Sequence, residues 1–419
     1  MHPAAATGLE VRSFRALTYR RRDPGHLARV SSPAYDLVTP EGRDRLTAAD
    51  PHNIVRLILP GVASGPDGAD ATRRSVAGAA ATLRDWETSG VLERDRGAAL
   101  WVYTMRPPDG APETVGWLGA VGLPRAGSRA VLPHEDTFPV AVEGRRALLA
   151  ATATDLEPIV LAHDPQPDVP ALTATAQDGA PTLEVTDADG VRHALWRVAD
   201  PALSAAVTTA LAETGAVIAD GHHRFAAARA YGADAILALV TPMGPGGLRV
   251  QPIHRVVPDL ALDEALSAAA ADFRVTELAG AGSPAEVVER WIADPAESGL
   301  LVSDGSQVVR LDSPSGEVLA AVPAEAPAAW RGLDVVLAHH GLVQRLWSRD
   351  DDHGGVLIAH GVEEALDGAR NRRGVAVLLR APSPADVAAV ARANARMPRK
   401  STLFVPKPRT GLVLRPHGD

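Results

Sequence analysis

The sequence predicts an α/β fold, with α+β as the alternative, built on a mixed sheet. Apolar runs of strand length alternate with helical patterns over residues 98–257, which is typical of helices packed on a sheet. The apolar run at 216–219 leads through a glycine turn into a helix of small residues that ends before Gly232. The 419 residues, 46% of them hydrophobic and 22% charged, are enough for two or three domains.

We expect three regions along the chain. Residues 1–125 form an N-terminal α/β region, and residues 126–258 form a core that holds the sequence Asp-Gly-His-His-Arg. Residues 259–419 form a C-terminal α+β region whose tail can fold back to the site. The last division follows a change in sequence texture at Pro258.

Composition excludes several classes of protein. The chain has no cysteine, which excludes disulfides, thiolate metal sites and a cysteine nucleophile. Its net charge of −9 disfavours a general nucleic-acid binder, and no apolar run reaches the roughly 18 residues of a membrane span. The N-terminal residues lack the basic and apolar regions of a signal peptide. We therefore expect a cytoplasmic protein without nucleic-acid or membrane partners, and leave a homodimer open.

The first region contains helices and strands in turn. Thr39-Pro40-Glu41 starts a helix, with Thr39 as N-cap and Pro40 at the first helical position. The apolar run at 53–59 is predicted as a strand, in which Arg56 is either a secondary substrate-binding residue or a solvated edge residue. Further expected elements are a helix over 70–88 and a hairpin of strands over 98–105 and 114–123.

In the core region, residues 163–181 are rich in proline, aspartate and alanine and are predicted as a mobile loop. Asp200 caps a helix opened by Pro201, which leads directly into the strand at 216–219. Other strands are expected over 159–162, 182–185, 191–198, 235–240 and 251–257. Beyond them we expect helices over 260–271, 284–292 and 334–347, a meander over 300–322 and a strand–helix–strand unit over 355–379.

The pentapeptide from Asp220 to Arg224 is the first candidate site. A strand that turns through Gly221 into a helix directs the first free N–H groups of the helix at one spot, where the helix dipole favours an anion. His222, His223 and Arg224 add groups that bind phosphate or move protons, and Asp220 is a candidate base or metal ligand. The alternative is a pair of histidines that only caps the helix.

Two other stretches are candidates for the same site. The loop that contains His134, Glu135 and Thr137 combines an imidazole with carboxylates, so Glu135 is a second candidate base or metal ligand and the other two are secondary substrate residues. The alternative is a polar loop that caps the next helix. In the tail, the predicted phosphate contacts are Lys400, Ser401, Thr402 and Lys407, and the alternative is a tail that packs through its apolar residues.

Four stretches together resemble one family, the bacterial and archaeal domain-of-unknown-function 1015 family. These are Ala34-Tyr35-Asp36 with Pro40-Glu41, Pro133-His134-Glu135-Asp136-Thr137, Ala219-Asp220-Gly221-His222-His223-Arg224-Phe225, and the tail from Met397 to Lys407 with Thr410-Gly411. The resemblance extends over essentially the whole chain, but the family name implies little about function.

A more distant resemblance is limited to Gly221-His222-His223-Arg224, which is similar to the phosphate-binding loop of the ParB and sulfiredoxin superfamily. Sulfiredoxins have their reactive cysteine where this chain has His222, so that activity is disfavoured. ParB proteins carry a DNA-binding helical domain that is not visible here. The free-serine kinase branch has a similar Asp-Gly-His-His-Arg run.

The resemblance to that branch implies a nucleotide-dependent kinase that phosphorylates a small hydroxylated metabolite, with free L-serine as the first guess. ATP or ADP would be the co-substrate, and Mg²⁺ would offset the phosphate charge. Asp220, Glu135 and His223 would be the catalytic residues. The alternatives are a metal-dependent phosphohydrolase and a nucleotide-binding regulatory module without turnover.

Overall fold

The computed structural model describes residues 8–61, 68–125, 127–244, 246–278, 282–294, 296–349, 355–398 and 400–418. These residues form two compact units, described separately below. Unit 1 consists of Met1–Leu248 and Pro406–Asp419, and unit 2 of Arg249–Val405. Both units combine helices with a sheet, so the predicted α/β class with a mixed sheet is confirmed.

Unit 1 is built on a nine-stranded sheet in the order β6-β11-β8-β12-β5-β4-β10-β9, with β1 paired to β5 outside this path. The β6–β11 and β8–β12 pairs are parallel and the other pairs are antiparallel. The strands are β1 (Val11–Arg12), β4 (Leu100–Arg106), β5 (Thr114–Gly122), β6 (Val131–Leu132), β8 (Ile159–His163), β9 (Leu183–Thr186), β10 (Arg192–Val198), β11 (Ala216–Asp220) and β12 (Ala235–Pro242). The predicted hairpin is the β4–β5 pair.

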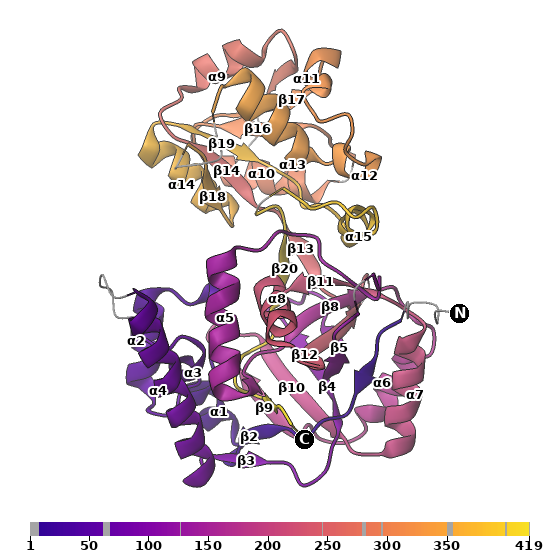
Figure 1. Ribbon diagram of the computed structural model, residues 1–419. Coiled ribbons are helices and arrows are strands. Elements are labelled where there is room, and N and C mark those ends of the chain that lie inside the picture. The colour runs from indigo at the N-terminus through magenta and orange to yellow at the C-terminus, as the bar shows by residue number, and fades with distance from the viewer. Residues whose placement is uncertain are drawn as a thin grey trace. The chain divides into compact units, whose positions relative to one another are not determined.

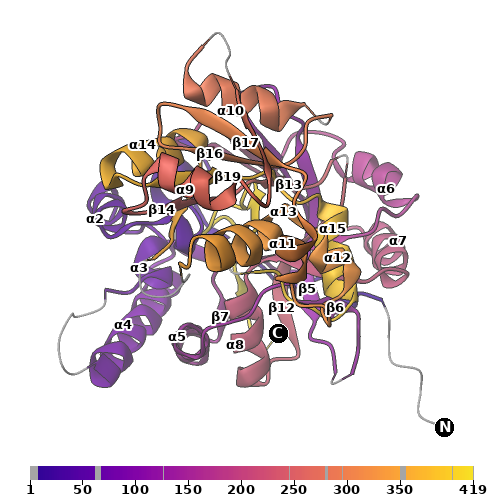
Figure 2. The same ribbon diagram turned by 90° about the horizontal axis from the view of Figure 1, so that it is seen from above.

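Helices cover both faces of this sheet (Figure 1, Figure 2). α5 (Pro139–Thr152) packs against α8 (His222–Tyr231) on one side, and α6 (Val169–Ala176) packs against α7 (Pro201–Ala212) on the other. The other helices are α1 (Pro24–Val30), η1 (Tyr35–Leu37), α2 (Pro40–Ala49), α3 (Val55–Ile58) and α4 (Gly68–Thr88). Two short ribbons complete unit 1, β2 (Leu17–Tyr19) with β3 (Leu92–Arg94) and β7 (Thr154–Asp155) with β21 (Arg415–Pro416).

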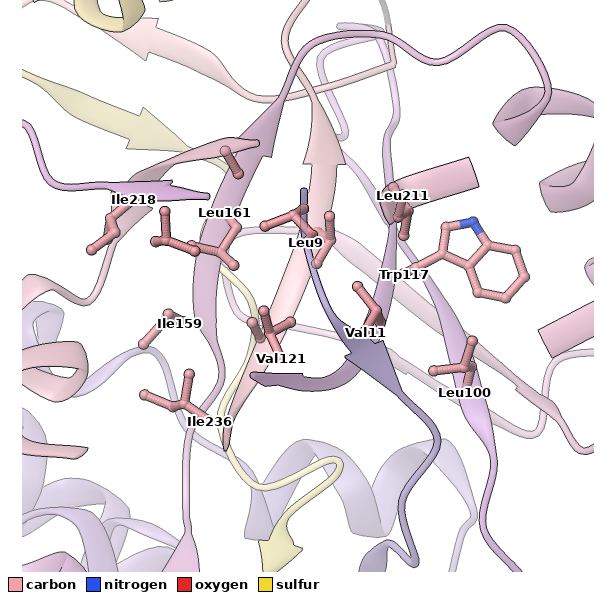
Figure 3. Packing of buried hydrophobic residues seen from close by; sticks show 14 of the residues in the cluster. Leu9, Val11, Leu100, Trp117, Val121, Ile159, Leu161, Leu211, Ile218 and Ile236 are labelled. Carbon is pink, nitrogen blue, oxygen red and sulfur yellow. The ribbon is translucent and has the colours of Figure 1, made fainter. Parts of the chain in front are cut away.

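The core of unit 1 lies between the sheet and its helices (Figure 3). Ile159, Leu161 and Ile218 come from β8 and β11, and Trp117 and Leu211 come from β5 and α7. All of these side chains are almost completely buried. The strand that ends at Asp220 is therefore fixed by apolar packing along its length, which gives the site a rigid base.

Two predictions for unit 1 are wrong. Residues 53–59 contain the short helix α3 instead of a strand, and the Asn53 side chain accepts a hydrogen bond from Val55 N at 2.9 Å in an Asx turn that directly precedes the helix. Residues 163–181 contain α6, in which Val169, Leu172 and Ala176 form one apolar face on the core. In both cases a short segment takes its conformation from local hydrogen bonds and from burial, which amino-acid composition does not predict.

The structure also divides the chain differently from the expected regions. Strands β4 and β5 precede residue 125 and pair with β10 and β12, which follow it, so one sheet spans that expected boundary. Unit 2 begins at Arg249 and its last residue is Val405, after which the chain rejoins unit 1. Unit 2 is therefore an insertion in the sequence of unit 1.

Unit 2 has a six-stranded sheet in the order β15-β17-β16-β19-β14-β18. Its strands are β14 (His254–Val257), β15 (Arg274–Glu277), β16 (Leu300–Ser303), β17 (Val308–Asp312), β18 (Leu357–Ala359) and β19 (Val375–Leu378), and a separate ribbon joins β13 (Arg249–Gln251) to β20 (Leu403–Val405). Its helices are α9 (Leu262–Ala269), α10 (Pro284–Ala293), α11 (Gly316–Ala320), α12 (Ala328–Arg331), α13 (Asp334–Val336), α14 (Val362–Arg372) and α15 (Pro384–Arg392).

The helix predicted over 334–347 is α13 followed by η2, a π-helix over Leu337–Leu346. Its wider turn is visible at the end, where Trp347 N donates to Leu342 O. Among the described residues, no helix combines the length and apolar character needed to cross a bilayer.

Candidate functional site

The strand expected before Gly221 is β11, the turn is at Gly221 itself, and the helix that follows is α8. Gly221 has φ +95°, a conformation that glycine adopts without the steric penalty of a side chain. A Cβ atom at this position would lie 2.6 Å from Ile159 Cγ2, so the turn requires glycine for space as well as for conformation. The amino end of α8 is thereby fixed directly beside the end of β11.

Parallel pairing brings a second loop to the same place. β6 pairs with β11 in parallel, with Val131 opposite Ala216 and Leu132 opposite Val217. Because parallel strands have their carboxyl ends at the same edge of the sheet, the loop at 133–138 and the turn at Gly221 emerge together.

This pairing places His134, Glu135, His222 and His223 in one cluster. The His134 and His222 rings are 4.6 Å apart, and His134 N donates to His222 Nε2 at 3.3 Å. Glu135 Oε1 lies 3.8 Å from His134 Nε2, and Glu135 Oε2 lies 4.0 Å from His222 Nδ1. His223 accepts a hydrogen bond from Phe138 N at 3.1 Å and stacks on the Phe138 ring. Glu135 is half-buried, with 30% of its side chain exposed.

Asp220 lies within a cluster of alternating charges. Its Oδ2 accepts from Arg224 Nη2 at 2.5 Å, and its Oδ1 is 2.7 Å from Lys407 Nζ. Lys407 also pairs with Asp36, whose side chain is 40% exposed. Asp220, Arg224 and Lys407 are nearly buried, while Asp36 forms the accessible side of the cluster.

The charges in this cluster hold one another in their ionised forms. Burial alone would raise the pKa of Asp220, but Arg224 and Lys407 outweigh it and lower that pKa. Burial would lower the pKa of Lys407, but Asp220 and Asp36 outweigh it and raise that pKa. A carboxylate with a lowered pKa between two cations is a weak proton acceptor, which disfavours Asp220 as the base.

The Arg224 side chain is enclosed by backbone and aromatic groups. Its Nη1 donates to Pro158 O at 2.6 Å, and its guanidinium carbon lies 5.5 Å from the centre of the Tyr35 ring. Arg145 covers the same ring at 3.8 Å. Glu157 accepts from Tyr35 N at 3.0 Å and contributes, with Asp220, to the raised pKa of Arg224, which burial alone would lower.

Residues 406–418, here called the return segment, deliver Lys407 to this cluster. Thr410 forms a bridge with Ser32, and its hydroxyl donates to Glu157 Oε1 at 2.9 Å. Arg409 N donates to Tyr103 Oη at 2.9 Å, and Arg409 Nε donates to the Ser31 hydroxyl at 2.6 Å. The hydrogen bonds of Arg409 and Thr410 therefore fix the backbone just after Lys407 and hold Lys407 close to Asp220.

The structure brings together most, but not all, of the residues that the sequence singled out. His222 contacts Glu135 and His134, His223 contacts Phe138 in the same loop, and Arg224 and Lys407 both contact Asp220. Arg56 instead donates from Nη2 to Thr47 O at 2.6 Å, away from these contacts. The other predicted positions are Thr137 in the loop before α5, and Lys400, Ser401 and Thr402 in unit 2, where a role at the phosphate site stays a prediction.

Sequence reasoning missed Asp36, Tyr35, Arg145 and Glu157 as site residues. The first two belong to the Ala34-Tyr35-Asp36 stretch that resembles the family pattern, so a signal was present for them. No sequence motif surrounds Glu157, so no signal was present for it. Its place in the site follows only from its hydrogen bonds with Tyr35 and Thr410.

The family model for a protein of unknown function, DUF1015, matches residues 11–336. The chain belongs to this family. No curated protein matches the chain in sequence. For this DUF1015 protein, membership of the family leaves the activity open.

Solved structures give only weak likenesses. SbnI with a C-terminal truncation, from Staphylococcus aureus, is 13% identical with a TM-score of 0.36, covering 70% of this chain and 85% of that one. A mutant free serine kinase in complex with ADP is 15% identical with a TM-score of 0.35, covering 72% and 93%. A conserved hypothetical protein from Pyrococcus furiosus is 14% identical with a TM-score of 0.32, covering 68% and 92%.

Proposed function

We propose that this protein transfers a phosphoryl group from a nucleotide to the hydroxyl group of a small metabolite. The first substrates to test are L-serine as acceptor and ATP or ADP as donor. The observation that carries the proposal is the position of Glu135, a half-buried carboxylate 4.0 Å from His222 at the amino end of α8. A helix amino end binds phosphate, and a carboxylate beside it can accept a hydroxyl proton.

The reaction needs little beyond binding, orientation and one proton acceptor. The hydroxyl oxygen of the acceptor attacks the terminal phosphorus, the bond from that phosphorus to the bridging oxygen breaks, and the shortened nucleotide leaves with that oxygen. Glu135 receives the hydroxyl proton. The N–H groups at the start of α8 and the imidazole of His222 hold the phosphate, while Asp220 keeps Arg224 and Lys407 in place beside it.

Mg²⁺ fits this site as an ion carried by the nucleotide. Among the described residues, no group of three histidine, aspartate or glutamate side chains is arranged to hold a metal ion. Mg²⁺ bound to phosphates needs only one or two protein carboxylates, which Glu135 or Asp220 would supply. In that position the ion would offset the negative charge of the phosphates.

The test is a search for phosphorylated product with the purified full chain, a nucleotide, Mg²⁺ and a panel of hydroxylated metabolites that includes L-serine. Turnover should fall about a hundredfold in Glu135→Gln, which keeps the shape but cannot accept the proton. Glu143→Gln is the matched control, because Glu143 is an exposed residue paired with Arg146. If phosphate is released at the same rate with and without an acceptor, the protein is a phosphohydrolase and the proposal is wrong. If the protein binds nucleotide but forms no product with any acceptor, it is a regulatory module and not a kinase.

A further inference from the structure

Three side chains connect a surface turn of unit 1 to the return segment. Tyr103 on β4 and His193 on β10 are diagonal neighbours on one face of the sheet, because Leu195 is opposite Tyr103. Tyr103 Oη lies 2.8 Å from His193 Nδ1, and His193 Nε2 lies 3.1 Å from Asp187 Oδ2. At the other end, Arg409 N donates to Tyr103 Oη at 2.9 Å. We call Tyr103, His193 and Asp187 the buried network, and the proposed phosphoryl transfer does not use it.

The buried network reaches the surface at Asp187. Tyr103 and His193 are each only 1% exposed, whereas 15% of the Asp187 side chain is exposed, in the turn between β9 and β10. Asp187 Oδ1 accepts from Asp189 N at 3.0 Å and from Val191 N at 2.9 Å, so the turn itself fixes this carboxylate. Asp187 therefore gives the buried imidazole a contact through which protons can exchange with solvent.

The direction of each hydrogen bond follows from the chemistry of the groups. The Asp187 carboxylate only accepts, so His193 Nε2 carries a proton, and Nδ1 of a neutral imidazole is then an acceptor. Tyr103 Oη therefore donates to His193 Nδ1 and accepts from Arg409 N. In this arrangement every donor has one acceptor, so the structure suits a neutral His193.

Protonation of His193 disrupts this arrangement. Nδ1 becomes a donor, so the hydroxyl proton of Tyr103 loses its acceptor. Among the described residues, the other polar partner of Tyr103 Oη is Arg409 N, which is itself a donor. A buried donor without an acceptor is costly, and the new positive charge on His193 would also repel the Arg409 guanidinium. Both effects act against the present position of Arg409.

The groups that face His193 set the direction in which it titrates. Burial and the charge of Arg409 lower the pKa of His193 below its ordinary value of 6.5, although Asp187 opposes them. Burial would raise the pKa of Asp187, but its interactions with His193 and Arg409 outweigh it and lower that pKa. Burial raises the pKa of Tyr103, and Asp189 offsets part of the effect of burial on Arg409. His193 is therefore the member of the buried network that changes its charge in mildly acidic solution.

We infer that the buried network is a pH-sensitive switch, in which protonation of His193 loosens the return segment and weakens the contact of Lys407 with Asp220. Arg409 follows Lys407 by two residues, so the hydrogen bond at Arg409 N fixes the backbone beside that lysine. The Arg409 guanidinium keeps its hydrogen bond to the Ser31 hydroxyl, so we expect local loosening and not unfolding. The inference does not depend on the proposed phosphoryl transfer, because it requires neither nucleotide nor turnover.

The test is hydrogen exchange of the full chain without nucleotide, measured by mass spectrometry at several values from about pH 7.5 to about pH 5. After correction for the intrinsic pH dependence of exchange, wild-type peptides that contain residues 407–415 should exchange about tenfold faster at the acidic end. Peptides of β14 report on unit 2 and separate local loosening from global unfolding. His193→Gln does not titrate and should lack the increase, while His360→Gln, at an exposed position in unit 2, should keep it.

Tyr103→Phe gives an independent check, because it removes the hydroxyl group that links His193 to Arg409 and keeps the ring. In this variant residues 407–415 should exchange faster already at about pH 7.5 and should respond little to pH. If His193→Gln fails to fold, the comparison of Tyr103→Phe with the wild type decides. The inference is overturned if wild-type exchange of this segment does not increase down to about pH 5. It is also overturned if His193→Gln keeps the increase, or if Tyr103→Phe responds to pH as the wild type does.

Discussion

Replacing Asp220 by asparagine tests the charge cluster at the end of β11. The two carboxylate oxygens of Asp220 accept from Lys407 and Arg224 at 2.7 and 2.5 Å. Asparagine keeps the shape but loses the negative charge, and its amide nitrogen turns a donor toward one of these two donors. Asp220→Asn should therefore destabilise unit 1.

The structure sets the expected size of this loss. Removing one partner of a buried ion pair costs about 3–5 kcal/mol, because the remaining charge stays buried. Asp36 still pairs with Lys407, and Glu157 still lies near Arg224, so we expect about 3 kcal/mol, at the lower end of that range. For a unit of this size, such a loss corresponds to a decrease in Tm of roughly 6–12 °C.

The pH dependence identifies the cause. Because folding lowers the pKa of Asp220, its contribution to stability is present above the unfolded value of about 3.9 and is lost as the pH falls through the lower folded value. The variant should therefore lose less stability than the wild type between pH 5 and about pH 2. Urea unfolding and Tm, with Glu143→Gln as control, measure both effects.

A loss below about 1 kcal/mol at pH 7 would refute this reasoning about the cluster. The opposite pattern, unchanged stability with turnover reduced about a hundredfold, would return the role of base from Glu135 to Asp220. Product formation is therefore measured on the same samples.

Four further outcomes are expected. Arg224→Ala should abolish thermal protection by nucleotide, a loss of about 2–3 kcal/mol in binding, as measured by the Tm difference with and without nucleotide. Lys407→Met should reduce turnover and, by leaving the buried Asp220 without one of its two cationic partners, lower the Tm, whereas normal turnover and Tm would show that the Lys407–Asp220 pair contributes to neither. Gly221→Ala should lower the free energy of unfolding by about 1–3 kcal/mol because of its φ of +95° and its contact with Ile159, which urea unfolding would detect. The pKa of His254 is lowered to about 4 by burial and by the nearby arginine, so stability should fall as the pH decreases from about 6.5 to 4, and a glutamine variant should show a flatter profile.

The sequence predicted the site best where the reactive residues lie within a single strand, turn and helix. The turn at Gly221 was predictable because an apolar strand, a glycine and a small-residue helix follow one another without interruption. The meeting of Glu135 with His222 depends on the parallel pairing of β6 and β11, which are separated by most of the core region. The residue types in the loop at 133–138 and in the turn at Gly221 predicted that both are reactive. Only the parallel pairing of β6 with β11 shows that the two emerge at the same edge of the sheet.

Other features depend on contacts that a linear pattern does not contain. Residues 53–59 are as apolar as a strand, yet the segment starts with an Asx turn at Asn53 and continues as helix α3. Glu157 has no unusual sequence context, yet it joins η1 to the return segment through Tyr35 and Thr410. Removing residues 397–419, an obvious test from the sequence, also removes the buried side chains of the return segment and would confuse folding with catalysis. A point substitution at Lys407 avoids this.

The insertion of unit 2 into unit 1 affects the order in which the site forms during synthesis. Arg249 and Val405 are opposite each other in the β13–β20 ribbon, so the two ends of the insertion lie within roughly 6 Å. The ribosome completes Asp220 and Arg224 early, but all of residues 249–405 must follow before Lys407 is made. At ordinary translation rates this interval lasts on the order of ten seconds or more. During that time the Asp220–Arg224 pair exists without its lysine, so the nascent chain acquires its complete site only after all of unit 2 has been made.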